Sequence, residues 1–392
     1  MRILQRAALL AATAGAATMA AGLAGAQDMD AALERFKQMM ADQAIAIDWK
    51  EAEISGNDAV LRGVRASSAS EAVPIGDLTL VGVEESDIGY TVESIAMPSY
   101  VYEQGDTRVA IDEVELTGVI LADDDADSPL AGILFYEGLT MGSAVVTAKG
   151  TDVFTMTGME IAITEPDETT PMDYTGTSES FTVDLSTVED PASRAAIEAM
   201  GYEQLTGNFE MAGFWNPSDG QLAMTQNDFS VDGAGTLGIS IDLGGYTTDF
   251  LSAVRDLQRQ MAESDDANSD AQGMAMLGLM QQLSLNGMEI AFDDDTLTGK
   301  VLQFLADQQG MRPQDVANQA KALLPLALGQ LNVPDFTMQA TQAVSVFLDD
   351  PQSIRIAAEP DAPVPFALIA AGAMASPQSA LDQMGVVVEA NR

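Results

Sequence analysis

The spacing of apolar residues predicts one amphipathic helix near the start of the chain, followed by strands. Apolar residues first recur at i, i+4, i+7 and i+11, at positions Met29, Leu33, Phe36 and Met40, which form one face of a helix. Near residue 45 the period becomes two, and apolar residues alternate with Ala46 and Asp48. Alternating segments separated by turn clusters such as Gly105-Asp106 continue to about residue 245, which predicts a long β region.

One helix is expected to interrupt these strands. Asp190 is a suitable N-cap, Pro191 fits the first helical position, and Gly201 follows the last turn. Because proline favours the first turn and glycine favours the position after the last, we expect a helix between these residues.

Helical spacing returns in the last third of the chain. Helices are expected at residues 250–261, 274–282, 300–309, 313–331 and 338–348, with a polar linker at 263–273. Strands are expected at 283–292, 353–358 and 386–390, with a buried helix between the last two. The returning strand at 283–292 indicates that the helices pack on the same sheet. We therefore predict an α+β fold: a large curved antiparallel sheet with helices concentrated in the C-terminal third. The expected regions are a β-rich repeat domain, 27–246, and a helix-rich region, 247–392.

A short pattern of apolar, any, apolar, any, Gly, apolar recurs along the strands. Copies lie at residues 78–83, 114–119, 154–159 and 283–288, and residues 229–233 match more loosely. The spacing of the first three suits one unit of several strands per repeat. Two alternating apolar residues would face a core, and the glycine would mark a bulge or a close approach that bends the strand. A large antiparallel sheet could show such short patterns without a true repeat, so both interpretations stay open.

The first 26 residues have the order of a cleavable signal peptide. Arg2 and Arg6 precede an apolar stretch of small residues, and Ala24-Gly25-Ala26 is a small-x-small cleavage pattern. With no cysteine near this position, we expect no lipidated N-terminus. No later apolar run is long enough to span a bilayer, so we expect a periplasmic or secreted protein without a transmembrane segment.

Composition removes several kinds of chemistry. The sequence contains no Cys and no His, which excludes disulfides, thiolate nucleophiles, Ser-His-Asp triads and the usual zinc sites. No nucleophile elbow and no phosphate-binding glycine loop is present, and we expect a protein without enzymatic activity. The formal net charge of −43 repels phosphate backbones, so nucleic acid is not an expected partner. The acidity fits solubility, and the alternative is a surface for a basic partner or divalent cations.

Two acidic runs partly match a calcium-binding loop. Asp123, Asp125 and Asp127 match the first positions of an EF-hand, but Ser128 and Leu134 stand where the motif requires Gly and Glu. Residues 266–277 fail in the same way. Both runs are interpreted as solvated turns, no cofactor is expected, and weak Ca²⁺ binding at these turns stays open.

Methionine is abundant, and several copies flank the repeats and the helix expected at 274–282. Met is flexible and polarisable and suits adaptable apolar surfaces. The candidate lining of a site for an apolar ligand is Met156, Met159, Met276, Met280 and Met288. The alternative is ordinary core filling.

The repeated strand–glycine units resemble those of AsmA-like and YdgA-like periplasmic β-repeat proteins and other Gram-negative envelope proteins. The stretches at 213–217, 235–237, 297–299 and 347–351 add to this resemblance. It implies a curved β-sheet that handles lipid or assists envelope assembly. AsmA-like proteins usually keep an N-terminal membrane anchor, whereas this chain has the cleavable type of leader. The leading hypothesis is a periplasmic protein that binds lipid or another apolar ligand in a curved β-groove. The alternative is a structural or adaptor protein of the envelope whose acidic surface binds a basic partner or divalent cations.

Overall fold

The computed structural model describes residues 25–43, 45–68, 71–167, 170–263 and 278–392. The chain divides into two compact units. The first is Met1–Asp167 with Tyr174–Asp184, and the second is Glu168–Asp173 with Leu185–Arg392. The boundary expected at residue 246 therefore lies inside the second unit, and three strands grouped with the repeats belong with the helices instead. The signal peptide and most of the linker at 263–273 lie outside the described residues.

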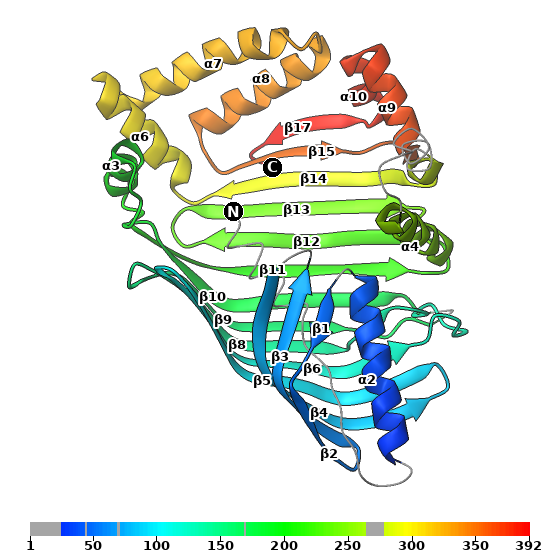
Figure 1. The fold of residues 1–392 in the computed structure, drawn as a ribbon. Coiled ribbons are helices and arrows are strands. Elements are labelled where there is room, and N and C mark those ends of the chain that lie inside the picture. The colour runs from blue at the N-terminus through cyan, green and yellow to red at the C-terminus, as the bar shows by residue number, and fades with distance from the viewer. Residues whose placement is uncertain (1–24, 44, 69–70, 168–169, 264–277) are drawn as a thin grey trace. The chain divides into compact units, whose positions relative to one another are not determined.

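The first unit is an antiparallel sheet whose strands follow one another in chain order. Its strands are β1 (Ala46–Asp48), β2 (Glu51–Ser55), β3 (Asp58–Ser68), β4 (Glu71–Ser86), β5 (Gly89–Gln104), β6 (Thr107–Ala122), β7 (Leu134–Phe135), β8 (Gly138–Ala148), β9 (Thr151–Ile163) and β10 (Met172–Asp184). β1 and β2 both pair with β3, and β6 pairs with the short β7 as well as with β8. Figure 1 shows that the long strands of this unit are bent.

Helix α2 (Gly25–Asp42) packs on this sheet and supplies much of the core. The predicted stripe of Met29, Leu33, Phe36 and Met40 is at most 1% exposed, so the helical period identified the buried face correctly. These side chains pack with inward residues of β3–β6 such as Leu61.

The repeat glycines mark positions where the strands change the face that they bury. In β9, Met156 and Met159 both pack against the core, although a regular strand would send residues three apart to opposite faces. Gly158 between them has a φ of 58°, in the left-handed region. Gly82 and Gly118 have φ values of 66° and 59° and stand at the same place in their repeats. The glycine therefore marks the point where the strand changes which of its alternate residues face the core. In the sequence, this change is visible as the last apolar residue of the pattern, which follows the preceding one by three positions instead of two.

These switches line up across neighbouring strands, because the strands stay in register on both sides of them. We call one such row the glycine crease: Pro98, Glu113, Gly142, Gly158 and Glu179, one residue each from β5, β6, β8, β9 and β10. Glutamate side chains lie over the glycines of the crease, and a Cβ built on Gly158 would be 2.5 Å from Glu179 Cδ. The fourth copy differs, since Gly287 lacks a positive φ and lies at a register shift between β13 and β14.

The second unit has its own antiparallel ladder. Its strands are β11 (Gln204–Asn216), β12 (Gln221–Val231), β13 (Gly235–Gly244), β14 (Ser284–Asp294), β15 (Ser353–Ala358), β16 (Val364–Pro365) and β17 (Val386–Ala390). They pair in the order β11–β12–β13–β14–β15–β17, with β16 also on β14.

Helices gather around the ends and the last edge of this ladder. They are α3 (Pro191–Met200), α4 (Thr248–Glu263), α6 (Leu297–Gln309), α7 (Pro313–Gly329), α8 (Pro334–Asp349), α9 (Phe366–Ala375) and α10 (Pro377–Gln383). The prediction for α3 is confirmed: Asp190 accepts a hydrogen bond from Ser193 N at 2.8 Å, and Gly201 is left-handed. Helix α8 packs along β17, the last strand of the ladder.

The fold class expected from the sequence is confirmed. The chain is α+β, its large sheet is antiparallel, and its helices lie mostly in the C-terminal third. Among the described residues, no helix is both long and apolar enough to cross a membrane.

Candidate functional site: an open apolar sheet face

The central strands of the second unit place their apolar residues at directly opposed positions. Leu237 on β13 pairs with Phe292 on β14, and Ile239 pairs with Ile290 one row further along. Because opposed residues in a ladder point to the same side, these rows share one face of the sheet. The open apolar face consists of Phe209, Phe229, Leu237, Ile239, Ile241, Met288, Ile290, Phe292, Ile354, Ile356 and Val388.

Within the part of the chain that the structure describes, no packing layer closes this face. Five of its members are 37–47% exposed: Phe229, Leu237, Met288, Ile290 and Ile356. The remaining members are half-buried. Such exposure is unusual for large apolar side chains in the middle of a sheet, where a covering layer normally buries them. Contiguous exposed apolar surface of this kind marks a site for a ligand or a partner.

Aromatic side chains extend the face at its β11–β12 end. The rings of Phe209 and Phe229 stack with centroids 5.9 Å apart, which confirms that these opposed residues lie on the same side. Two stacked rings next to branched aliphatic side chains offer a flat surface that adapts to the shape of an apolar molecule.

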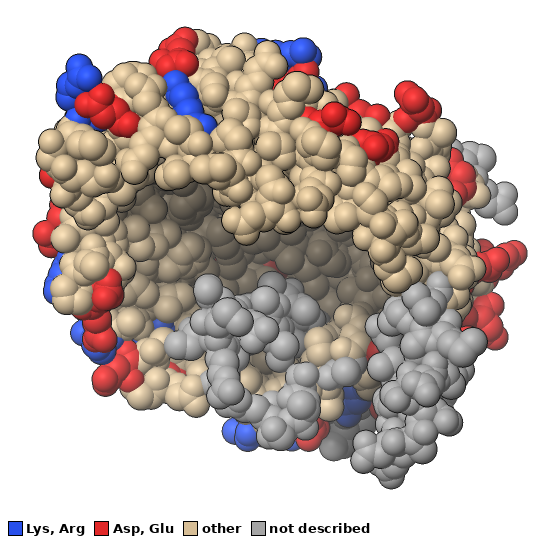
Figure 2. All heavy atoms as spheres, turned by 90° about the horizontal axis from the view of Figure 1, so that it is seen from above, with Lys and Arg blue, Asp and Glu red and all other residues tan. Residues whose placement is uncertain are grey.

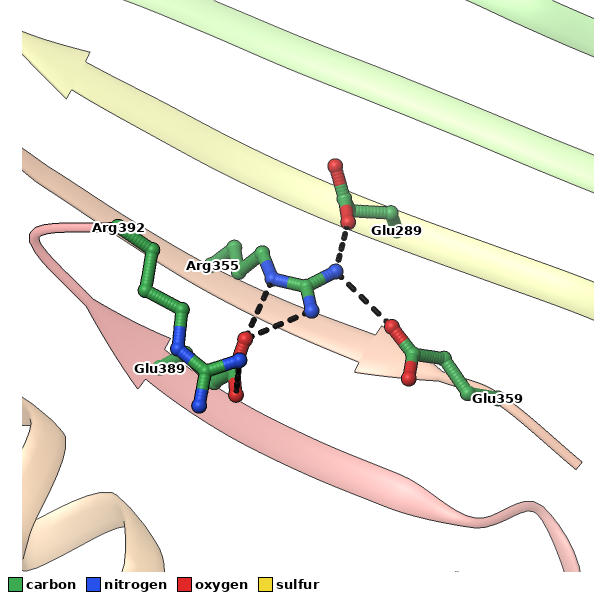
Figure 3. A network of polar contacts seen from close by, with 5 residues as sticks. All are labelled: Glu289, Arg355, Glu359, Glu389 and Arg392. Atoms are coloured by element: carbon green, nitrogen blue, oxygen red, sulfur yellow. Dashed lines mark hydrogen bonds and ion pairs between the residues drawn. The ribbon is translucent and has the colours of Figure 1, made fainter.

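The other side of the same strands carries charge. Arg355 on β15 donates to Glu389 on β17 at 2.7 Å and to Glu359 at 2.9 Å, and it also pairs with Glu289 on β14 (Figure 3). Arg392 approaches Glu389 from the chain end. These hydrogen bonds, Glu289 first, raise the pKa of the Arg355 guanidinium above its usual range.

The charged network makes the two sides of the sheet chemically different. It ties β14, β15 and β17 together on one side, while the same strands expose hydrocarbon on the other. Figure 2 shows, on the face in view, scattered Asp, Glu, Lys and Arg side chains beside larger stretches of other residue types. The contrast between the two sides favours an apolar molecule on one of them.

The end of this sheet at Trp215 is closed by packing. Trp215 is 5% exposed and donates from Nε1 to the Tyr246 carbonyl at 2.7 Å. The Tyr246 ring lies 5.2 Å from that of Phe250 on α4, next to a small cluster of buried side chains. The open apolar face therefore has one sealed end and an exposed middle.

The predicted methionine lining is divided between the two units. Met156 and Met159 lie on β9 of the first unit and pack against its core. Met288 lies on the open apolar face, and Met280 is 40% exposed beside the last described turn before β14. Met276 lies outside the described residues. Met288 is thus the predicted residue that belongs to the candidate site.

The aliphatic residues of the site were not proposed from the sequence as ligand-lining. Their signal was the alternation of Leu237, Ile239 and Ile241, which predicted a strand. A second alternating strand, with Met288 and Ile290, pairs with it. The alternation predicts a strand but does not indicate whether a helix covers its apolar side.

The first acidic run serves an ion pair in the first unit. Arg35 of α2 is 8% exposed and donates from Nε to the Ala122 carbonyl at 3.0 Å. Its guanidinium also lies 3.0 Å from Asp124 and 3.6 Å from Asp123. Part of this acidic turn therefore forms ion pairs with α2 at the end of β6. The second run, 266–277, lies outside the described residues, and Ca²⁺ binding stays a prediction.

A shallow hollow follows the glycine crease on the first unit. Its volume is about 460 Å³, and its lining includes Met159 together with the carboxylates of Glu113, Glu115 and Glu160. The side chains of Glu113 and Glu179 lie over Gly142 and Gly158 in this region. Its acidic lining does not match an apolar ligand, so the open apolar face is the stronger candidate.

Comparison with known proteins gives a match to a protein-family model. A family model described as "Uncharacterized protein" matches residues 228–391. A search of curated proteins finds no match. The matched segment includes β13, β14, β15, β17 and α6–α8, and so most of the open apolar face. The resemblance to AsmA-like and YdgA-like proteins stays a prediction.

Proposed function

We propose that this protein is a non-enzymatic envelope protein that binds a lipid-like, apolar ligand on the open apolar face. The observation that carries the proposal is the exposure of large apolar side chains at adjoining positions on β12–β15, with the charged network of Arg355 on the opposite side. Export to a periplasm or to the exterior, as the leader predicts, is part of the same proposal.

The energetics suit a ligand made mainly of hydrocarbon. Burying a whole Leu, Ile or Phe side chain contributes about 1.5–3 kcal/mol, so covering the exposed part of each contributes about 1 kcal/mol. Several such contributions, each modest, add up to useful affinity only when one ligand covers neighbouring residues together. An extended acyl chain meets this requirement better than a small polar molecule.

Extraction of the natural ligand tests the proposal directly. The mature protein, purified from the compartment in which it accumulates, should show additional mass in native mass spectrometry, and organic extraction should release lipid at a fixed stoichiometry. A clean mass with no extractable lipid would instead favour the adaptor function on the acidic surface.

A matched pair of variants locates the site. Leu237→Asn with Ile290→Asn places amides on the open apolar face, whereas Thr236→Asn with Ser240→Asn places them on the opposite side of β13. With the neutral probe N-phenyl-1-naphthylamine, the first pair should weaken binding about tenfold or more, and the second should leave it unchanged. Equal effects from both pairs would move the site away from this face.

A further inference from the structure

Helices α7 and α8 form a hairpin whose turn exposes large apolar side chains. Leu323 is 54% exposed and Leu326 is 70% exposed, both in the last turns of α7. Leu331 in the connection and Met338 in the first turns of α8 are 54% and 65% exposed. We call these four residues the hairpin tip. They lie in and around the connection between the two helices.

The sequence of the tip is unusual for such an acidic chain. The segment from Val316 to Pro334, which includes most of the tip, contains no acidic residue and one basic residue, Lys321. Lys321 is 15% exposed and pairs with Asp349 at the end of α8, so its charge is compensated within the hairpin. The nearest acidic residue is Asp335, in the first turn of α8, where a carboxylate favours the helix N-terminus.

A groove between the two helices has no charged lining. Its volume is about 720 Å³, and it is bordered by residues such as Pro325, Val333 and Met338. Three hydroxyl residues of α8 line it at intervals of one turn, Thr337, Thr341 and Ser345.

Each of these hydroxyls already has a partner. Thr337 donates to the Val333 carbonyl at 2.8 Å, Thr341 to the Thr337 carbonyl at 2.6 Å, and Ser345 to the Thr341 carbonyl at 2.7 Å. Hydroxyls bonded back to their own helix need neither water nor a polar ligand, and helices in lipid satisfy their polar groups in the same way.

We infer that the hairpin tip is a membrane-docking element, which inserts Leu326 and its neighbours into the interfacial layer of an uncharged, zwitterionic lipid surface. Hydrocarbon at the tip supplies the affinity, and the hydroxyls bonded to their own helix lower the cost of removing their part of the groove from water. The charge of the chain selects the surface, because a net charge of −43 is repelled by anionic lipid and not by zwitterionic lipid. Docking does not depend on a ligand on the open apolar face.

The absence of cysteine from the sequence makes the test direct. The full mature chain with Leu326→Cys, labelled with a polarity-sensitive nitrobenzoxadiazole dye, is mixed with phosphatidylcholine vesicles. We expect a blue shift and a rise in emission, together with flotation of the protein with the vesicles. Adding phosphatidylglycerol should weaken both effects. Flotation without a change at the label would show that another surface docks, and no flotation at all would overturn the inference.

Matched variants separate the tip from general surface hydrophobicity. Leu326→Asp with Leu331→Asp should reduce the vesicle-bound fraction about tenfold or more. Met374→Asp, on α9 at 85% exposure, changes an even more exposed apolar residue outside the tip and should have no effect. Equal loss in both would overturn the inference. Sedimentation without vesicles gives a further outcome: a dimer lost only in the tip variant would assign the tip to a second copy of the chain. Probe binding on the open apolar face should stay unchanged in every tip variant, which keeps failure of the two proposals distinguishable.

Discussion

The glycine crease makes a quantitative prediction for the substitution of Gly158 by alanine. Two separate effects contribute. A left-handed backbone disfavours any residue with a Cβ, by about 1–2 kcal/mol. In addition, the new methyl group would lie 2.5 Å from Glu179 Cδ, so the glutamate must leave its place over the crease. Displacing a packed side chain of this kind adds about 1 kcal/mol, at the low end for overpacking because Glu179 is exposed. The expected total is about 2–3 kcal/mol.

Gly105 provides the control for the backbone contribution. Its φ of 60° nearly equals that of Gly158, but a Cβ there meets nothing within 4 Å. Gly105→Ala should therefore show the backbone effect alone, about 1–2 kcal/mol. In a Glu179→Ala background, Gly158→Ala should fall to the same value, because the displaced side chain is gone.

The assay is urea unfolding followed by tryptophan fluorescence. The sequence has two tryptophans, Trp49 and Trp215, and they belong to different units. In a Trp215→Phe background the signal reports the first unit, through Trp49 packed on its core beneath the Lys37 ammonium. If Gly158→Ala and Gly105→Ala reduce the free energy of unfolding equally, or if Glu179→Ala gives no relief, the packing explanation of the crease is refuted.

Three further predictions concern charged groups. Arg35→Met should destabilise the first unit by about 1–3 kcal/mol in urea, because the Ala122 carbonyl loses its charged donor; a loss below about 0.5 kcal/mol would contradict this. The pKa of Asp77 is held below its usual value by the Gly63 N–H and by a neighbouring guanidinium, so its stabilising effect is present above about pH 4 and disappears as the pH falls through the depressed pKa. Asp77→Asn should reduce the loss of unfolding free energy at acid pH. If the acid part of the curve of unfolding free energy against pH is unchanged, Asp77 does not contribute to it. Arg355→Met leaves three carboxylates without their shared cation and should destabilise the second unit by about 1–3 kcal/mol, measured through Trp215 fluorescence and judged against an unaffected Trp49 signal.

The local features of this fold were predictable because each depends on nearby residues. A helical stripe such as Met29, Leu33 and Phe36 identifies its buried face without knowledge of the partner sheet. The cap at Asp190 and the stop at Gly201 are properties of one short segment. The repeated glycine pattern was also visible in the sequence. The apolar residues on either side of its glycine are three positions apart, because the strand changes there which residues face the core.

Features that depend on what covers a surface were not predictable. Met159 and Met288 occupy equivalent positions in two copies of the repeat, yet Met159 is partly buried against the core of its unit and Met288 is 38% exposed. Met159 packs against the core of the first unit, whereas the described residues leave the face around Met288 open. Likewise, alternation in β13 and β14 predicts strands equally well for a buried and an open face. The unit boundary was missed for the same reason, since β11–β13 look like the preceding strands and differ only in their partners.

The packing of α8 along β17 has a consequence for solubility. β17 contains Val386, Val387 and Val388, a short run with strong β propensity, and among the described residues its ladder partner is β15 on one side. An uncovered edge of this composition would recruit strands from other molecules and seed fibres. Helix α8 shields that edge with Phe347 and its neighbours buried. Shortening or melting α8 would therefore expose an edge at which chains can pair and polymerise, well before the rest of the sheet unfolds.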